Sequence, residues 1–394
     1  MSSFEESLGE ELARLEREGL LRAPDDGALR RQVVEAAAGL GLEPIDASSN
    51  NYLALAELDV SRETSVQVGG ATAGAGASRL IHGTRALHLA LEQALARWVR
   101  RPAALLFTSG YAANVGLISA LSRPGAAIFS DELNHASIID GCRLGRAQVV
   151  VTPHLNLLAL EQALAEHRSA VERVVVTESY FSMDGDGPDL AALRQLCDEH
   201  DARLIVDEAH ALGVFGEEGA GRCALAGIAP DALVGALGKA VGVQGAFVAG
   251  SERLRTLLWN RARSFVFSTA TSPLLAERAL FHVERTRAAD DRRRKLEADT
   301  ADLRGRLEAR DIRVLPGSFG PIVPVLIGAN QRAVDVANAL AQHGILTQAI
   351  RPPTVPDGTA RLRVTVTTGW PRDGAARIAE AIATALGRSG PSRH

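Results

Sequence analysis

The chain has 394 residues, 46% of them hydrophobic, and a formal net charge of -4. This length permits a large buried core and about two to three domains, and the absence of a basic excess gives no support to a nucleic-acid or anionic-membrane partner. No apolar run approaches the roughly 20 residues that cross a bilayer, so we expect a cytoplasmic protein without a membrane segment.

The first 47 residues form an N-terminal segment that begins with the acidic, amphipathic stretch "SFEESLGEELARLEREG". Between residues 103 and 250, short apolar runs rich in β-branched residues alternate with helical periods. The runs cover residues 103–107, 126–129, 148–151, 173–177, 203–206, 232–237 and 245–250. Continuous apolar strands alternating with helices predict a mostly parallel sheet covered on both faces.

The pattern changes after Pro273, where a long charged stretch predicts one or two helices. A strand "IVPVLIG", a helix, a strand pair around "ILTQAI" and "ARLRVTVTT", and a last helix follow. We therefore expect an N-terminal segment (1–47), a large α/β domain (48–285) and a smaller C-terminal α+β domain (286–394).

The three cysteines, Cys142, Cys197 and Cys223, are odd in number, widely spaced and without a C-x-x-C pair. This spacing predicts neither a disulfide framework nor a metal site. We expect these cysteines to be small core residues.

Polar side chains follow the predicted strands, at the edge where open α/β sheets bind ligands. The first run is followed by "TSGYAAN", a Ser109-Gly110 turn that opens a helix and suits a phosphate. Later runs are followed by residues with titratable or hydroxyl side chains. These residues are Asp131, His135, Glu178, Ser182, Asp184, Asp207, His210 and Lys239.

Each of these signals also has an ordinary structural explanation. A Ser-Gly turn is common between a strand and a helix, an isolated histidine is often only a surface or core residue, and Asp207 could cap the next helix. The stretch "GALGK" is not a nucleotide P-loop, because Leu233 and Ala240 stand where that motif needs Gly and Ser or Thr. The functional interpretation depends on all these groups meeting at one sheet edge.

Together these groups describe a site for pyridoxal 5'-phosphate. We expect the amine of Lys239, surrounded by glycines and apolar residues, to have a lowered pKa, which favours reaction with an aldehyde. A buried carboxylate can hold a pyridinium nitrogen protonated, and a helix N-terminus can bind a phosphate.

Seven ordered motifs carry a resemblance over nearly the whole chain. They are "SSNNYLAL", "GAGASRLIHGTRALHLALE", "SGYAAN", "DELNHASIIDG", "ESYFSMDGD", "VDEAHALGVFGEEGAGR" and "GKAVGVQGA". In this order they resemble the α-oxoamine synthases, enzymes of pyridoxal-phosphate fold type I. The resemblance implies a decarboxylative condensation of an amino acid with an acyl thioester.

The resemblance also implies roles for residues of the cofactor site. Lys239 would bind the cofactor covalently and later move the Cα proton of the amino acid, and Asp207 would pair with the pyridine nitrogen. His135 would stack on the ring and polarise the thioester carbonyl, while His210 and Ser182 would contact the ring hydroxyl. The phosphate would be bound by Ser109, Gly110 and Tyr111 together with the partner subunit's Thr269 in a homodimer.

For the substrates, the resemblance implies that Arg363 binds the amino acid carboxylate, with Asn51 nearby. Arg22 and Arg351 are weaker candidates for binding the acyl substrate. The stretch "AIRPPTVPDGTARLRVTVT" resembles the branch of the family that joins L-alanine to pimeloyl-CoA or a pimeloyl-acyl carrier protein in biotin synthesis. The alternatives are glycine or serine with another acyl thioester, or a catalytically silent homologue.

The sequence departs from the family pattern at three places. Ala236 stands where the resemblance implies a threonine that binds the phosphate, "HLN" (154–156) replaces "HND", and "TTGW", ending at Trp370, replaces "TAAH". These departures leave open the strictness for alanine and the effect of Ala236 on cofactor binding, and the sequence does not distinguish coenzyme A from acyl carrier protein as the acyl carrier.

Overall fold

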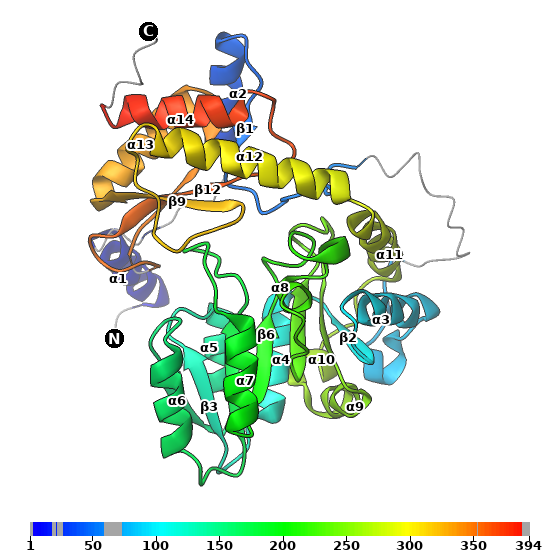
Figure 1. Cartoon of the computed structure of the whole chain (residues 1–394). Coiled ribbons are helices and arrows are strands. Elements are labelled where there is room, and N and C mark those ends of the chain that lie inside the picture. The colour runs from blue at the N-terminus through cyan, green and yellow to red at the C-terminus, as the bar shows by residue number, and fades with distance from the viewer. Residues whose placement is uncertain (1–2, 18–20, 22–26, 59–72, 353, 388–394) are drawn as a thin grey trace.

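The computed structural model describes residues 3–17, 21, 27–58, 73–352 and 354–387 (Figure 1). Its largest sheet has seven strands in the order β2-β8-β7-β6-β5-β3-β4. The strands are β2 (Ala103–Phe107), β3 (Ala127–Asp131), β4 (Gln148–Thr152), β5 (Arg173–Glu178), β6 (Arg203–Asp207), β7 (Ala232–Ala236) and β8 (Ala246–Gly250). Each of the seven predicted runs is confirmed as a strand, and the bounds agree within two residues.

Only β8 runs against its neighbours in this sheet, and every other pairing is parallel. The other six strands therefore end at the same edge. The prediction of a mostly parallel sheet is therefore confirmed. The chain segments that follow these six strands lie near one another at that edge.

Helices cover both faces of the sheet because successive strand residues point to opposite sides. On one face Leu204 and Val206 pack with α3 (Ala86–Trp98), α6 (Leu157–Glu166), α7 (Leu190–Glu199) and α11 (Pro273–Arg287). On the other, Ile205 packs with α4 (Gly110–Leu121), α5 (Ala136–Arg143), α9 (Glu252–Arg261) and α10 (Arg263–Val266). The three cysteines are free and buried, as predicted.

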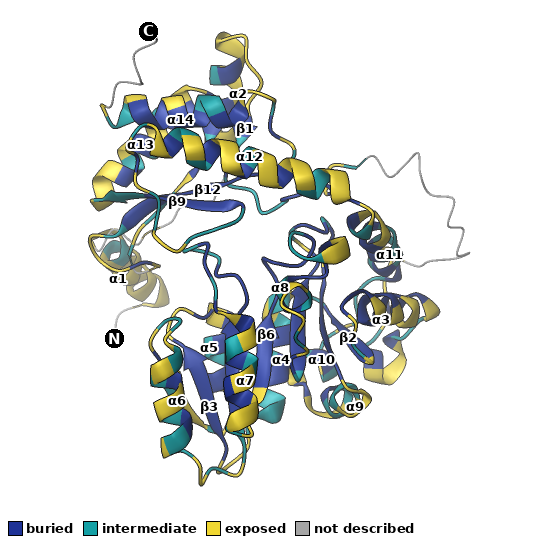
Figure 2. Cartoon of the chain, in the orientation of Figure 1, coloured by how far each residue is buried: buried dark blue, intermediate teal, exposed yellow. Residues whose placement is uncertain are grey.

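A second, antiparallel sheet has the order β11-β12-β9 and its own hydrophobic core. Its strands are β9 (Ile322–Gly328), β11 (Gln348–Ile350) and β12 (Ala360–Thr365). The helices of this part are α12 (Asp290–Glu308), α13 (Asn330–Gln342) and α14 (Gly374–Ala385). Figure 2 shows that both sheets are dark, buried layers with exposed helix surfaces outside them.

The remaining elements are short or lie at the N-terminus. They are α1 (Phe4–Arg17), α2 (Ala28–Gly39), β1 (Ile45–Asp46), a π-helical turn (Arg79–Gly83), a 3-10 turn (Glu217–Gly219), α8 (Arg222–Leu225) and β10 (Ile345–Leu346). β1 pairs in parallel with β10, which attaches this N-terminal stretch to the C-terminal sheet region. Among the described helices, none is long and apolar enough to span a membrane.

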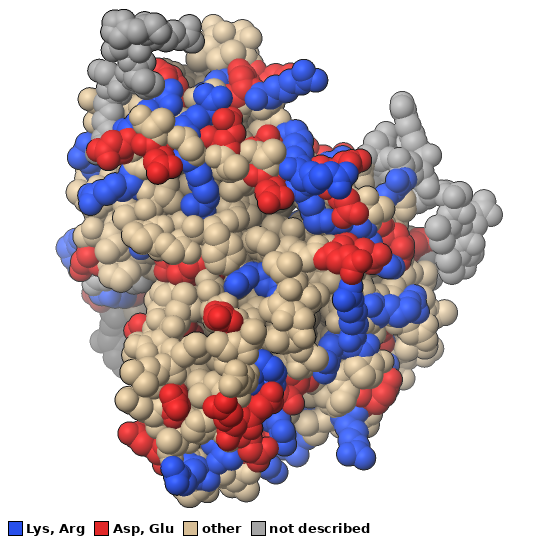
Figure 3. Space-filling view, viewed as in Figure 1, with Lys and Arg blue, Asp and Glu red and all other residues tan. Residues whose placement is uncertain are grey.

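The charged stretch after Pro273 forms two helices that belong to different cores. α11 packs on α3 beside the large sheet, whereas α12 packs on α14. α12 buries Leu296, Leu303 and Leu307 on one side. Its exposed side carries ion pairs between residues three or four positions apart, and both signs of charge occur on the face of the molecule that Figure 3 shows.

Candidate active site

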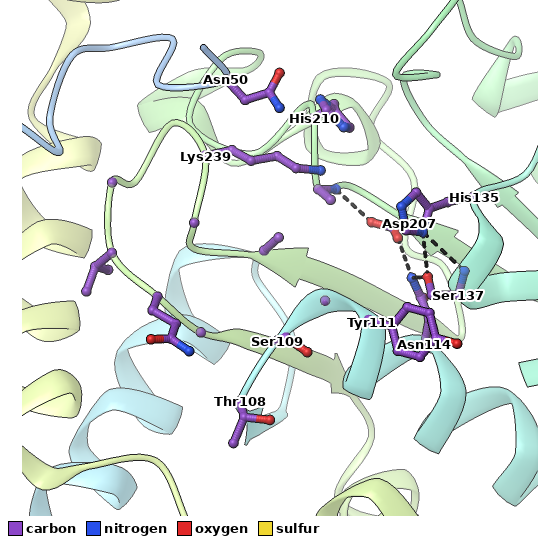
Figure 4. Close-up of a pocket in the computed structure, with 18 of the residues that line it drawn as sticks. Asn50, Thr108, Ser109, Tyr111, Asn114, His135, Ser137, Asp207, His210 and Lys239 are labelled. Carbon is purple, nitrogen blue, oxygen red and sulfur yellow. Dashed lines mark hydrogen bonds between the residues drawn. The ribbon is translucent and has the colours of Figure 1, made fainter. Parts of the chain in front are cut away.

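A cavity of about 530 Å³ opens at the carboxyl edge of the large sheet (Figure 4). Most of the predicted cofactor residues line it, although they are far apart in the sequence. They are Ser109, Gly110, Tyr111, His135, Asp207, His210 and Lys239. The sheet brings them together because each lies at the carboxyl end of a strand or in the segment that follows it.

Lys239 lies in the turn between β7 and β8, and its side chain extends into the cavity toward Asp207 (Figure 4). Burial lowers the pKa of the Lys239 amine below its usual value, although Asp207 and Glu178 oppose this shift. Burial also raises the pKa of Glu178, and the nearby charge of Asp207 adds to that effect. The site therefore contains an amine that loses its proton more easily than an exposed lysine.

Asp207 is the last residue of β6 and is buried. Its Oδ1 accepts the Ala209 N–H at 2.8 Å, and its Oδ2 accepts a hydrogen bond from Asn114 Nδ2 at 2.7 Å. These two donors fix the carboxylate in one orientation at the floor of the cavity.

The start of α4 provides a site for an anion. The Ser109 hydroxyl accepts the Ala112 N–H, and the Ser109 carbonyl accepts the Ala113 N–H. The N–H groups of Gly110 and Tyr111 are left without a partner among the described residues, and they lie at the positive end of the helix dipole. Ala236 lies beside this turn, since a Cβ built on Gly110 would be 3.7 Å from the Ala236 Cβ.

His210 lies on the side of the cavity opposite this turn. Its Nδ1 is 2.7 Å from the hydroxyl of the buried Tyr52. Burial, together with the positive charge of Lys239 and Arg363, lowers the pKa of His210 well below its usual value. Burial raises the pKa of Tyr52 to about 12, so both side chains are neutral near pH 7.

The predicted substrate residue Arg363 lies behind the cavity wall. Its guanidinium is buried and donates to the Ser182 carbonyl at 2.5 Å, to Thr365 at 2.8 Å and to the Asn50 side chain at 2.9 Å. Asn50 itself lines the cavity. The side chain of the neighbouring Asn51 accepts the Ala56 N–H at 3.3 Å and so stabilises the turn of residues 51–56.

The other predicted residues lie outside this cavity. Ser182 and Arg351 line a second cavity of about 1210 Å³ next to the first, and His135 lines both. Thr269 is exposed and forms an isolated antiparallel bridge with Ser78. Arg22 lies outside the described residues.

Four residues near the site had not been singled out from the sequence. Asn50, Asn114 and Ser137 line the cavity, and Tyr52 bonds His210. Asn50 and Tyr52 lie in the motif "SSNNYLAL", and the other two lie in "SGYAAN" and "DELNHAS". The motifs were therefore visible in the sequence, but which of their side chains face the cavity was not.

Two departures from the family pattern have structural roles. The indole N–H of Trp370 donates to the Asp46 carbonyl at 2.9 Å, which holds β1 in place. The Asn156 side chain accepts the Ala159 N–H at 2.9 Å and caps α6.

His154 joins two carboxylates at the edge of the second cavity. Its Nδ1 is 2.9 Å from Asp131, and its Nε2 is 3.1 Å from Asp186. Together with Asp184, His154 and Asp186 place potential metal-ligand atoms within 4.8 Å of one another, but Asp184 is ion-paired with Arg361. The network holds the loop 181–186, whose Ser182 carbonyl accepts from Arg363.

Replacing His154 with glutamine is expected to destabilise the protein in a pH-dependent way. Burial lowers the pKa of His154, but hydrogen bonds to Asp131 and Asp186 outweigh it and raise the pKa from 6.5 to about 10. A group whose pKa is higher in the folded than in the unfolded protein stabilises the folded state fully at pH values below its unfolded-state pKa. This stabilisation is lost as the pH rises through the folded-state pKa. The difference in melting temperature between wild type and H154Q should therefore be largest below pH 6.5, fall as the pH rises, and be nearly lost at pH about 10.

The exposed His343 provides a matched control, because H343Q should show no such pH-dependent difference. A constant difference between wild type and H154Q from pH 6 to pH 11 would contradict a charged His154.

Pyridoxal 5'-phosphate fits the donor set of the first cavity. A nucleophilic amine, a fixed carboxylate and unpartnered N–H groups at a helix start are the three contacts that its aldehyde carbon, ring nitrogen and phosphate need. The fold and this site define a pyridoxal-phosphate-dependent enzyme of fold type I.

Comparison with known proteins agrees with this class. Residues 43–382 match the family "Aminotransferase class I and II". An 8-amino-7-oxononanoate synthase of Geobacter sulfurreducens is 44% identical over 91% of this chain and 93% of that protein. One of Aromatoleum aromaticum is 46% identical over 85% of this chain and 87% of that protein. The chain belongs to the 8-amino-7-oxononanoate synthase family of α-oxoamine synthases and is a pyridoxal-phosphate-dependent acyltransferase.

Solved structures of the same superfamily have the same fold. A serine palmitoyltransferase of Sphingomonas wittichii superposes with a TM-score of 0.82 at 28% identity over 87% of each chain. An 8-amino-7-oxononanoate synthase of Francisella tularensis superposes with a TM-score of 0.75 at 25% identity over 87% of this chain and 98% of that one.

Proposed function

We propose that this chain condenses L-alanine with a pimeloyl thioester to form 8-amino-7-oxononanoate and carbon dioxide, as a step of biotin synthesis in the cytoplasm. The observation that carries this proposal is the position of His135 between two cavities. One contains Lys239 and Asp207, and the other is more than twice as large in volume. A two-substrate condensation needs such a junction.

The second cavity has the lining that an acyl chain requires. Apolar side chains form much of its wall, and Arg351 lies among its lining residues. The apolar residues include Leu133, Ile139, Phe181, Val334, Ala337 and Ile350. A flexible dicarboxylic acyl chain could bury its methylenes here and place its distal carboxylate near a cation.

Within the first cavity, the residues divide the work of binding and proton transfer. When bound, the cofactor supplies an electron sink for a carbanion beside the amine. Asp207 keeps the ring nitrogen protonated, and the N–H groups of Gly110 and Tyr111 bind the phosphate. Lys239 would hold the aldehyde carbon until the amine of alanine replaces it there, and the freed Lys239 amine would then remove the Cα proton of alanine and return a proton after carbon dioxide leaves.

The amino acid is oriented by Arg363 and Asn50. Arg363 is buried, and its guanidinium donates a hydrogen bond to the side chain of Asn50, which lines the cavity. A substrate carboxylate that replaces the Asn50 oxygen would gain a charge-assisted hydrogen bond in a water-poor site.

A homodimer would complete the phosphate site with the partner subunit's Thr269. The support is an exposed apolar surface where two segments meet. The Ala270 N–H donates to the Ala77 carbonyl, and the nearby Ile81 and Phe267 are among the most exposed large hydrophobic side chains described. Such a surface is typical of an interface.

The test is a steady-state assay of the holoenzyme with L-alanine, glycine and L-serine, each with pimeloyl-CoA, pimeloyl-acyl carrier protein and palmitoyl-CoA. We expect turnover with alanine and a pimeloyl thioester, and the better carrier identifies the donor. Faster turnover of serine with palmitoyl-CoA would instead support the activity named for the structurally similar palmitoyltransferase. Cofactor binding without turnover of any pair would indicate a silent homologue.

A further inference from the structure

A chain of hydrogen bonds links the cofactor carboxylate to His135. Asn114 Nδ2 donates to Asp207 Oδ2 at 2.7 Å and to Ser137 Oγ at 2.9 Å. Ser137 Oγ lies 2.8 Å from His135 Nδ1, and the Ser137 backbone N–H donates to the same nitrogen at 3.2 Å. Figure 4 shows the four side chains as one connected group. Asn114 and Ser137 are buried, whereas His135 is open toward the cavities.

The direction of each hydrogen bond in this chain can be derived. An ionised Asp207 only accepts, so Asn114 must present its NH₂ group to it. The second hydrogen of that NH₂ group points to Ser137 Oγ, which then has its own hydrogen available for His135. The backbone N–H of Ser137 can only donate, and it also points at Nδ1. His135 Nδ1 is therefore an acceptor without a proton.

A neutral imidazole carries one proton, so an unprotonated Nδ1 leaves it on Nε2. An imidazolium would place a hydrogen on Nδ1 against the Ser137 backbone N–H, which cannot turn away. Burial lowers the pKa of His135, which also favours the neutral ring. No described residue forms a hydrogen bond with Nε2, and His135 lines both cavities.

We propose that Asn114 and Ser137 are positioning residues that hold His135 as the Nε2–H tautomer, so that it donates a hydrogen bond to the thioester carbonyl oxygen where the two cavities meet. This inference rests on the proposed function for the identity of the acceptor. His135 then acts as a hydrogen-bond donor, and Lys239 removes the proton. The same Asn114 amide fixes Asp207, so one side chain orients both the ring-nitrogen partner and the donor.

The tautomer is tested by nitrogen-15 NMR of the holoenzyme labelled at histidine, with the His135 signals assigned from an H135N spectrum. At neutral pH, wild type should show a protonated Nε2 and an unprotonated Nδ1. S137A should keep the Nε2–H form as the major one but show more of the Nδ1–H form than wild type, because the remaining backbone hydrogen bond of 3.2 Å holds Nδ1 less strongly than the two contacts together. A protonated Nδ1 in wild type would overturn the proposal.

Kinetics test the consequence for the reaction. S137A should lower kcat with the acyl thioester about tenfold, the size of one hydrogen bond. Its cofactor absorbance and its affinity for alanine should stay unchanged. The matched control is S119A on the same helix as Asn114, because the Ser119 hydroxyl donates only to the Val115 carbonyl within α4.

A double-mutant comparison separates positioning from general stability. If Ser137 acts through His135, S137A should have no further effect on kcat in the H135N background. Independent, multiplicative losses in the double variant would overturn the proposal. If wild type turns over no thioester, the proposed function fails, while the NMR result still decides the tautomer.

Discussion

Replacing Lys239 with alanine is expected to abolish covalent retention of pyridoxal phosphate and to lower turnover by on the order of 10⁴-fold, the range of a lost proton-transfer group. Lys239 is the only described lysine that lines the first cavity. The measurements are visible absorbance after gel filtration, with and without borohydride reduction, and turnover of the reconstituted variant. Wild type should keep the visible absorbance through gel filtration and lose it on borohydride reduction, which leaves the cofactor attached to Lys239 as a secondary amine, whereas K239A should show neither the absorbance nor the attached cofactor.

The sequence offers an unusually clean control for this experiment. The chain has only two lysines, Lys239 and Lys295, and Lys295 is paired with Asp299 on the outer side of α12. K295A should therefore retain cofactor and activity. Borohydride labelling of the Lys295 peptide in wild type, or retention of a reducible chromophore by K239A, would contradict the assignment.

Replacing Asp207 with asparagine is expected to lower kcat by about 10²- to 10³-fold, the effect of removing one preorganised electrostatic contact. The amide has nearly the same size, but it cannot hold the ring nitrogen protonated. Its NH₂ group would also face the donors of Ala209 or Asn114, which now meet the carboxylate. Cofactor should still attach through Lys239, with an altered absorbance spectrum and weaker retention.

The control is D231N at the opposite edge of the same sheet. Asp231 accepts the Leu204 N–H and pairs with Arg194, away from the cavity. This variant should keep the wild-type spectrum and kcat when both proteins are compared at a temperature at which D231N is fully folded. Equal losses of kcat in D207N and D231N would show that the effect is structural and would contradict the role of Asp207.

The sequence predicted the large sheet well, because buried parallel strands require continuous apolar runs. All seven runs became strands, and the three cysteines are buried. The same logic located the site, since polar residues directly after a buried strand must emerge at the sheet edge. Lys239, Asp207, His135 and His210 were found in this way, and they line one cavity.

Side-chain direction within the turns was harder to predict. Asn51 was singled out, but its neighbour Asn50 lines the cavity and bonds Arg363. In an irregular turn the backbone angles set which of two adjacent side chains faces inward, and no sequence periodicity records them. The resemblance to α-oxoamine synthases named the motif but did not decide between its two asparagines.

Sequence by itself therefore determined the family, the strands and the chemical groups at the sheet edge, since these depend on local patterns and on the order of short motifs along the chain. Only the tertiary structure decided how those groups are oriented. Asn114 meets Asp207 across 93 positions and Ser137 across 23. His154 joins Asp131, the last residue of β3, to Asp186. Such contacts arise because packed strands bring distant segments to within a few ångströms, and the direction of each hydrogen bond then follows from which atom faces which.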